Sequence, residues 1–183
     1  MDCYQPNIEK LQSKSINVKS INLESEKFPF ANETFDIIIA NQIIEHTKEL
    51  FWIFHEISRT LKVNGHCIIG VPNLSSLHNR ILLLFGRQPT CITLDGPHVR
   101  GFTKKEFLSF TNNCWKGGYD CVGFAGSNFY PFSPSIATIL AHQLPRFAVC
   151  IFFLLKKSKS YNNEFIKILE EKPLETNFFK GEF

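Results

Sequence analysis

Glu45 and His46 form the pair of neighbouring residues with the most obvious chemistry in this sequence. They come shortly after the apolar run FDIIIA (35–40). Histidine titrates near neutral pH, so His46 could accept a proton from an attacking oxygen or nitrogen atom. The alternative is that the pair only begins the next helix. His46 and His55 lack the spacing of metal ligands, so we expect no metal site.

Two further groups of polar residues stand where a ligand could bind. Asn41 and Gln42 follow FDIIIA directly, and ligands of open α/β sheets bind at the carboxyl ends of the strands. Their alternative role is to cap the following helix. His98 and Arg100 lie in the glycine-bounded loop GPHVRG (96–101). Each of these two side chains could bind an anionic acceptor substrate or face water.

A strand, a helix and a second strand are expected to position these residues. FDIIIA is rich in β-branched residues and apolar on both faces, which is typical of a strand buried on both sides. Apolar residues then recur at helical spacing in KELFWIFHEISRTLK (48–62), and Asn64-Gly65 is a good helix stop. HCIIGVP (66–72) reads as the next strand. This βαβ pattern predicts an α/β fold with a mostly parallel sheet and helices on both faces.

The other elements follow from similar signals. Thr103 and Glu106 form a capping-box pattern at the start of one helix, and Ser75 could cap another that Gly86 ends. The expected domain covers residues 1–157, with an antiparallel strand near its carboxyl end, and residues 158–183 form a polar, peripheral tail. The remaining predicted elements are helices over 7–13 and within 161–172, and strands over 16–23, 119–126 and 146–155.

Composition excludes several functional classes. The 183 residues suit one domain, and the net charge of +3 is spread without a basic stripe, which disfavours nucleic-acid binding. The six cysteines include no CxxC pair, so we expect free thiols in a reducing cytoplasm and no zinc or disulfide framework. No apolar run reaches the roughly 18 residues of a membrane span. A soluble, cytoplasmic protein is the expectation.

The stretch SNFYPFSPSIATILAHQLPRF (127–147) is aromatic and interrupted by proline, so it cannot be one continuous helix. It could act as a lid for an apolar acceptor or as a peripheral membrane contact. Apolar residues between two strands are more often ordinary core, and the residue pattern leaves these alternatives open.

The order of short motifs between Phe28 and Asn73 resembles the middle of a class I methyltransferase that uses S-adenosylmethionine, of the type 11 kind. The later GPHVRGFTKKEF (96–107) resembles the loop and helix that follow in that family. The motifs are Pro29-Phe30, Phe35-Asp36, Glu45-His46, Glu56-Ile57 with Arg59, Leu61-Lys62, Gly65 and Pro72-Asn73.

The resemblance implies S-adenosylmethionine as the cofactor. Asp2 matches the acid that accepts hydrogen bonds from the ribose hydroxyls, although a solvated terminal residue is an equal alternative. Asn22 matches the residue near the adenine amino group, with Leu23 beside the ring, although Asn22 could instead bond to its own loop. Asn41 and Gln42 would lie near the methionine part. The reaction implied is in-line methyl transfer to an unidentified small-molecule, lipid or glycan acceptor, with His46 as the base.

In the family a strand and a glycine-rich turn precede the segment that resembles this chain, and these 183 residues contain no such turn. We therefore expect this chain alone to bind S-adenosylmethionine weakly or not at all. The rival interpretation is a non-catalytic remnant or interaction module that keeps the sheet. We also expect exposed apolar surface along one side of FDIIIA, and hence self-association.

Overall fold

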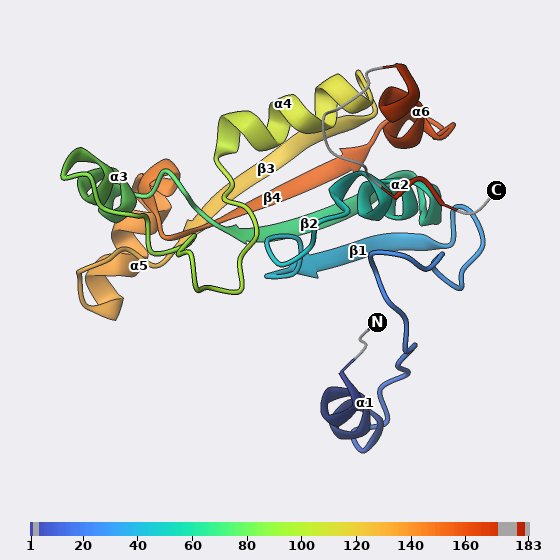
Figure 1. Ribbon diagram of the computed structural model, residues 1–183, viewed down its shortest axis with the longest axis horizontal. Coiled ribbons are helices and arrows are strands. Elements are labelled where there is room, and N and C mark those ends of the chain that lie inside the picture. Colours follow the sequence, from blue (N-terminus) through green and yellow to red (C-terminus); the bar gives the residue numbers. More distant parts are fainter. Residues whose placement is uncertain (2–3, 172–178, 182–183) are drawn as a thin grey trace.

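The computed structural model describes Met1, residues 4–171 and residues 179–181 (Figure 1). Most of its elements form a single sheet with helices packed against it, and α1 lies apart from that body (Figure 1). In chain order the described elements are α1 (Gln5–Gln12), β1 (Phe35–Asn41), α2 (Leu50–Thr60), β2 (Leu61–Pro72), α3 (Leu77–Leu84), α4 (Lys104–Cys114), β3 (Tyr119–Ser127), α5 (Pro134–Gln143), the 3-10 helix η1 (Pro145–Phe147), β4 (Cys150–Lys157) and α6 (Glu164–Glu171).

The strands form one four-stranded sheet in the order β1-β2-β4-β3. β1 runs parallel to β2, and β4 runs antiparallel to both β2 and β3. The α/β class and the antiparallel strand near the carboxyl end are confirmed. The described sheet is mixed rather than mostly parallel, because only one of its three strand pairs is parallel.

The strand expected over residues 16–23 does not form, apart from an isolated bridge at Ser20. Composition favours an extended chain there, but a strand also requires a neighbour that satisfies its backbone groups. No described strand of the sheet lies beside this segment.

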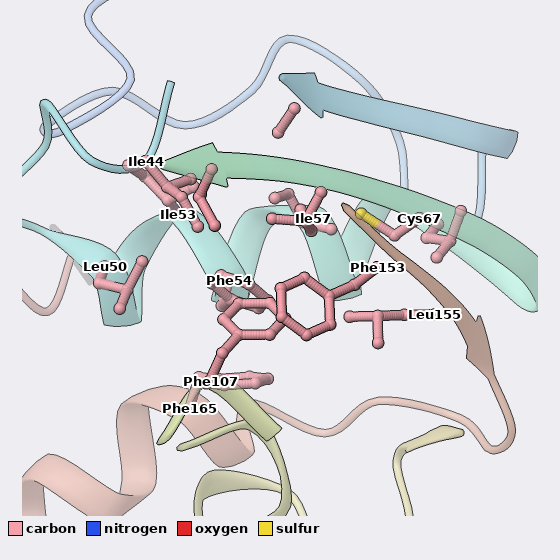
Figure 2. Packing of buried hydrophobic residues seen from close by; sticks show 14 of the residues in the cluster. Ile44, Leu50, Ile53, Phe54, Ile57, Cys67, Phe107, Phe153, Leu155 and Phe165 are labelled. Carbon is pink, nitrogen blue, oxygen red and sulfur yellow. The ribbon is translucent and has the colours of Figure 1, made fainter. Parts of the chain in front are cut away.

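The hydrophobic core lies on one face of the sheet. Cys67, Ile69 and Val71 alternate along β2 and are fully buried, as are their partners in β4. Helices α2, α4 and α6 cover this face, and Phe54, Phe107 and Phe165 of these helices meet Phe153 of β4 in the core cluster (Figure 2). The sequence-based expectation of a peripheral tail helix is wrong, because Phe165, Ile166 and Leu169 of α6 are buried.

The opposite face of β1 is exposed. Ile37 and Ile39 are 60% and 66% exposed, whereas Ile38 and Ala40 face the core side. The expectation that FDIIIA is buried on both faces is therefore wrong, because only the face that carries Ile38 and Ala40 packs against the core. The expected exposed apolar surface along this strand is confirmed.

Helix α2 ends at Thr60, before the Asn64-Gly65 stop that the sequence predicted. β2 begins at once, with Phe35 paired to Leu61, and the regular register resumes only at Ile37 and His66. Asn64 has a positive φ of 67°, so it adopts the left-handed conformation within this irregularity and not at a helix end.

Two other boundaries differ slightly from the prediction, and a third agrees with it. Ser76, not Ser75, caps α3 by accepting a hydrogen bond from the Asn79 amide. β4 begins at Cys150, because residues 145–147 form η1. Thr103 caps α4 as expected, with its hydroxyl accepting from the Glu106 amide.

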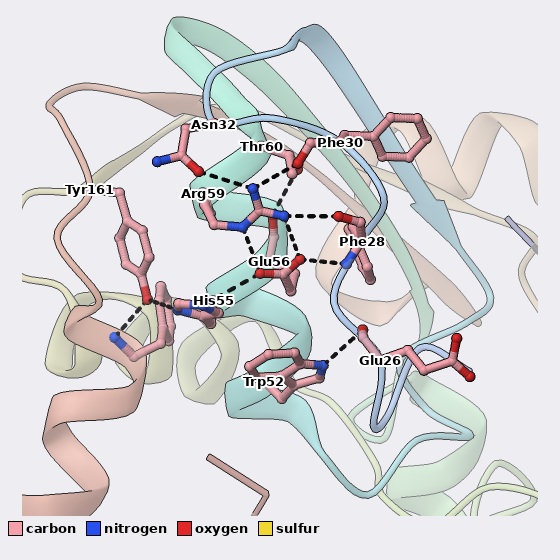
Figure 3. A network of polar contacts seen from close by, with 11 residues as sticks. Glu26, Phe28, Phe30, Asn32, Trp52, His55, Glu56, Arg59, Thr60 and Tyr161 are labelled. Atoms are coloured by element: carbon pink, nitrogen blue, oxygen red, sulfur yellow. Dashed lines mark hydrogen bonds and ion pairs between the residues drawn. The ribbon is translucent and has the colours of Figure 1, made fainter. Parts of the chain in front are cut away.

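A buried ion pair in α2 fixes the segment that leads into β1 (Figure 3). Arg59 donates to both carboxylate oxygens of Glu56 at 2.7 Å and to the carbonyl oxygens of Phe28 and Phe30. Glu56 in turn accepts from the Phe28 amide. His55 and Glu56 both have polar partners within the fold; Glu56 is fully buried, and His55 is partly buried.

Candidate functional site

The carboxyl end of β1 approaches the backbone of β2 closely. The amide of Gln42 donates to the carbonyl oxygen of Gly70 at 2.8 Å, and Gln42 itself has a positive φ of 55°. A Cβ atom at Gly70 would collide with Asn41 Oδ1 and with the ring of Phe152. Asn41 and Gln42 are exposed at this edge, where a ligand can reach them.

Glu45 is buried beside His46 in the turn that follows. The Glu45 side chain is 1% exposed, and neither of its carboxylate oxygens has a hydrogen-bond partner among the described residues. Burial raises the pKa of this carboxyl, while the nearby N–H of its own backbone and the charges of His46 and His98 oppose the shift. His46 Nε2 lies 4.0 Å from Glu45 Oε1, and the His46 side chain is 42% exposed.

The loop before α4 brings His98 to this pair. The rings of His46 and His98 meet edge to face with their centroids 4.6 Å apart. Nδ1 of His46 lies 3.3 Å from the carbonyl oxygen of Pro97, and the amide of Val99 donates to the carbonyl oxygen of Glu45 at 2.9 Å. Residues far apart in the sequence therefore form one cluster, which we call the Glu45 cluster: Glu45, His46 and His98.

Arg100 holds the same loop in place. Its Nη2 donates to the carbonyl oxygen of Lys48 at 2.6 Å, and its Nε has no partner within the described part of the chain. Burial lowers the pKa of the guanidinium, and the nearby Glu49 and Glu24 act in the opposite direction. Arg100 is partly buried, so it does not simply face water.

Asn22 already forms hydrogen bonds within its own turn. Its Oδ1 accepts from the Glu24 amide at 3.0 Å, and its carbonyl oxygen accepts from the Glu26 amide at 2.9 Å. Leu23 packs against the core cluster. Glu24 accepts from the amides of Lys48 and Glu49, so residues 22–24 lie beside the turn that carries His46. Asp2 lies outside the described residues.

Sequence reasoning missed a basic cavity of about 760 Å³ between α3, α4 and η1. Asn73, at the end of β2, forms part of its wall. Its positive residues come from three separate elements, so no local pattern could have revealed them. The cationic residues of the lining are Arg80, Lys104, Lys105 and Arg146, and no acidic residue lines it.

Comparison with solved structures identifies the fold. The chain resembles an S-adenosylmethionine-dependent methyltransferase from Thermotoga maritima, described as a possible histamine N-methyltransferase, with a TM-score of 0.60 and 17% identity over 85% of this chain and 70% of that one. A second such enzyme, from Archaeoglobus fulgidus, gives a TM-score of 0.53 and 15% identity over 82% and 72% of the two chains. At these identities the likeness shows the Rossmann-like methyltransferase fold alone.

Sequence comparison finds a partial match to one family. Residues 1–69 match the family described as a methyltransferase domain. A malonyl-[acyl-carrier protein] O-methyltransferase from Legionella pneumophila is 38% identical over 45 residues, which are 25% of this chain and only 16% of that protein. Through residues 1–69 the chain is thus similar to methyltransferase domains, and its likeness to solved S-adenosylmethionine-dependent methyltransferases shows the fold.

Proposed function

We propose that this protein transfers the methyl group of S-adenosylmethionine to a small-molecule, lipid or glycan acceptor. The observation that carries the proposal is the meeting of the family motifs at one edge of the sheet. Asn41 ends β1, Gln42 comes next, and the Glu45 cluster follows them at the edge where open α/β sheets bind ligands.

Each candidate residue has a proposed role. Asn41 and Gln42 contact the methionine part of the cofactor, and Leu23 packs on the adenine while Asn22 accepts from its amino group. For that contact Asn22 must leave the hydrogen bond to Glu24. Asp2 binds the ribose hydroxyls. His46 accepts the acceptor's proton, with His98 and Arg100 on the acceptor side.

We propose further that the acceptor carries an anionic group. The basic cavity supports this, because four cations without an acidic neighbour favour a carboxylate or phosphate. The Legionella relative is named for an O-methyl transfer to a malonyl group. The charge reversal Lys105→Glu should then raise the KM for an anionic acceptor and leave the affinity for S-adenosylmethionine unchanged.

Two further properties of the protein belong to this proposal. A lipid acceptor or a peripheral membrane contact is supported by exposed apolar side chains of α3 and α5, such as Leu84 and Ile139. No helix among the described residues is long and apolar enough to cross a membrane.

We also propose a cytoplasmic location, in keeping with the five free cysteines of the described chain.

The test is formation of S-adenosylhomocysteine by the purified chain. The assay uses millimolar S-adenosylmethionine, because we expect weak cofactor binding, and compares malonyl thioesters, acidic glycans, phospholipids and neutral analogues as acceptors. We expect turnover with an anionic acceptor. Absence of both cofactor binding and turnover across the panel would contradict the proposal and favour a non-catalytic module.

A further inference from the structure

The Glu45 cluster has an arrangement that hydrogen bonding within the described chain does not explain. Glu45 and His46 come from the turn after β1, and His98 comes from the loop before α4. One potential ligand atom from each residue lies within 4.8 Å of the others. Sequence spacing gave no reason to expect a metal site, because His98 joins the other two residues only in the folded chain.

The buried carboxylate of Glu45 needs a positive partner. An ionised carboxylate without a hydrogen bond or counter-ion is costly to bury. No described residue donates to either oxygen, and the 4.0 Å from His46 Nε2 to Oε1 is too long for a hydrogen bond that shares a proton. The carboxylate therefore faces the two imidazoles, and both of its oxygens are available to coordinate a cation.

Both histidines also present a free nitrogen. Nδ1 of His98 lies 2.8 Å from the carbonyl oxygen of Cys91, and Nδ1 of His46 lies 3.3 Å from that of Pro97. A carbonyl oxygen can only accept, so each Nδ1 carries the proton and each Nε2 keeps a lone pair. This is the pattern by which a backbone carbonyl fixes the tautomer of a metal-binding histidine.

We propose that Glu45, His46 and His98 bind a divalent transition-metal ion of the zinc class. Two histidines and one glutamate are a donor set of catalytic zinc sites, which keep an open fourth position. Tetrahedral zinc with nitrogen and oxygen ligands needs ligand atoms about 3.3 Å apart, so the side chains must draw together on binding. His46, at 42% exposure, leaves the ion a path from solvent.

The catalytic consequence rests on the proposed methyl transfer, whereas the site itself does not. At its open position the ion would bind an acceptor hydroxyl or a water molecule, and the pKa of that bound group would fall. In the metal-loaded protein His46 is then a ligand, and the ion takes over the task of promoting deprotonation that His46 performs in the metal-free protein.

The experiment measures metal binding without cofactor or acceptor. Chelator-treated protein is titrated with Zn²⁺ by calorimetry and with Co²⁺ by visible absorbance. We expect one equivalent to bind, and roughly 10- to 100-fold or weaker binding in Glu45→Gln and His98→Ala. His142→Ala and Cys121→Ser, which remove an exposed histidine and an exposed thiol outside the cluster, should bind as the wild type does.

Equal Zn²⁺ affinity in Glu45→Gln, His98→Ala and the wild type would overturn the site, as would an absence of binding in the wild type. Thermal melts show whether each variant is folded, and either variant alone suffices if the other unfolds. Metal binding without methyl transfer would support the site and count against the proposed function. Methyl transfer by a protein that binds no metal would support the proposed function and count against the metal site.

Discussion

At the scale of single residues, His55 is the described histidine whose environment most clearly opposes its charge. Burial lowers its pKa from 6.5 to about 4, although Glu56 lies 3.4 Å away and partly offsets the effect. Tyr161 OH accepts from the Phe165 amide and can donate to His55 Nδ1, which suits a neutral ring (Figure 3). His55 is therefore neutral in the folded protein at pH 7.

We predict a loss of stability on acidification that depends on His55. Between pH 6.5 and about 4 the unfolded chain binds the proton that the folded chain rejects, so this contribution is complete above pH 6.5 and decreases as the pH falls. Its full size is about 3 kcal/mol. Urea unfolding from pH 4.5 to 7.5 should show a shallower pH dependence for His55→Gln than for the wild type. His142→Gln, on the exposed surface, should keep the wild-type slope; an unchanged slope in His55→Gln would contradict the assignment.

His46→Ala should lower turnover more than it weakens cofactor binding. In the proposed role, the imidazole would act on the acceptor in the transition state and would not hold S-adenosylmethionine. Melting temperature, cofactor affinity and turnover are measured on one preparation. If His46 only packs against the loop at Pro97, turnover per folded molecule stays unchanged, and that result removes His46 from the mechanism.

The sequence was sufficient to nominate His46 and His98 but not to predict that they meet. Each stands beside a recognisable motif, whereas their contact depends on how the loop before α4 folds back over the turn after β1. The same limit applies to Asn22. Its family position indicates the adenine, but its side chain bonds to its own turn, the local alternative that asparagine commonly takes.

At the scale of elements, the buried ion pair between Glu56 and Arg59 gives this sequence motif a structural role. Arg59 connects α2 to the segment before β1 through the carbonyl oxygens of Phe28 and Phe30 and the amide oxygen of Asn32 (Figure 3). Both charged side chains are almost fully buried, so each depends on the other.

We predict that Arg59→Met lowers the free energy of unfolding by about 3–5 kcal/mol, because it leaves Glu56 buried without a counter-ion. The double variant Glu56→Leu/Arg59→Met should lose less than Arg59→Met alone. Lys62→Met is the matched control: it breaks the exposed pair with Asp36 at 2.9 Å and should cost less than about 1 kcal/mol. Equal losses in urea titrations of Arg59→Met and Lys62→Met would refute this account.

Apolar periodicity was enough to predict α2, α4 and the strand cores. Apolar periodicity failed where the pairing of strands decides the structure. Residues 16–23 have strand composition without a strand neighbour, and Asn64 marks an irregular register in β2 rather than a helix end. Neither outcome can be read from a local window of sequence.

At the scale of the whole molecule, we predict that the open side of β1 leads to self-association. Ile37 and Ile39 expose apolar surface on an edge strand with unpaired backbone groups, which favours pairing with another chain. Light scattering after size exclusion should show concentration-dependent self-association of the wild type. Ile39→Lys should shift the protein towards monomer, whereas Val122→Lys on the opposite edge strand β3 should not. A monomeric wild type at all concentrations would contradict the prediction.

We expect the cofactor to bind where β1 and β2 end, beside the Glu45 cluster. Titration of the ¹⁵N-labelled chain with S-adenosylmethionine, followed by NMR amide shifts, tests it most directly. We predict that the amides of residues 41–46, 70, 71, 73 and 98–100 shift with a common affinity, while those at the other end of the sheet, near Tyr119 and Lys157, stay in place. Shifts confined to that other end, or no shifts at millimolar cofactor, would contradict the claim.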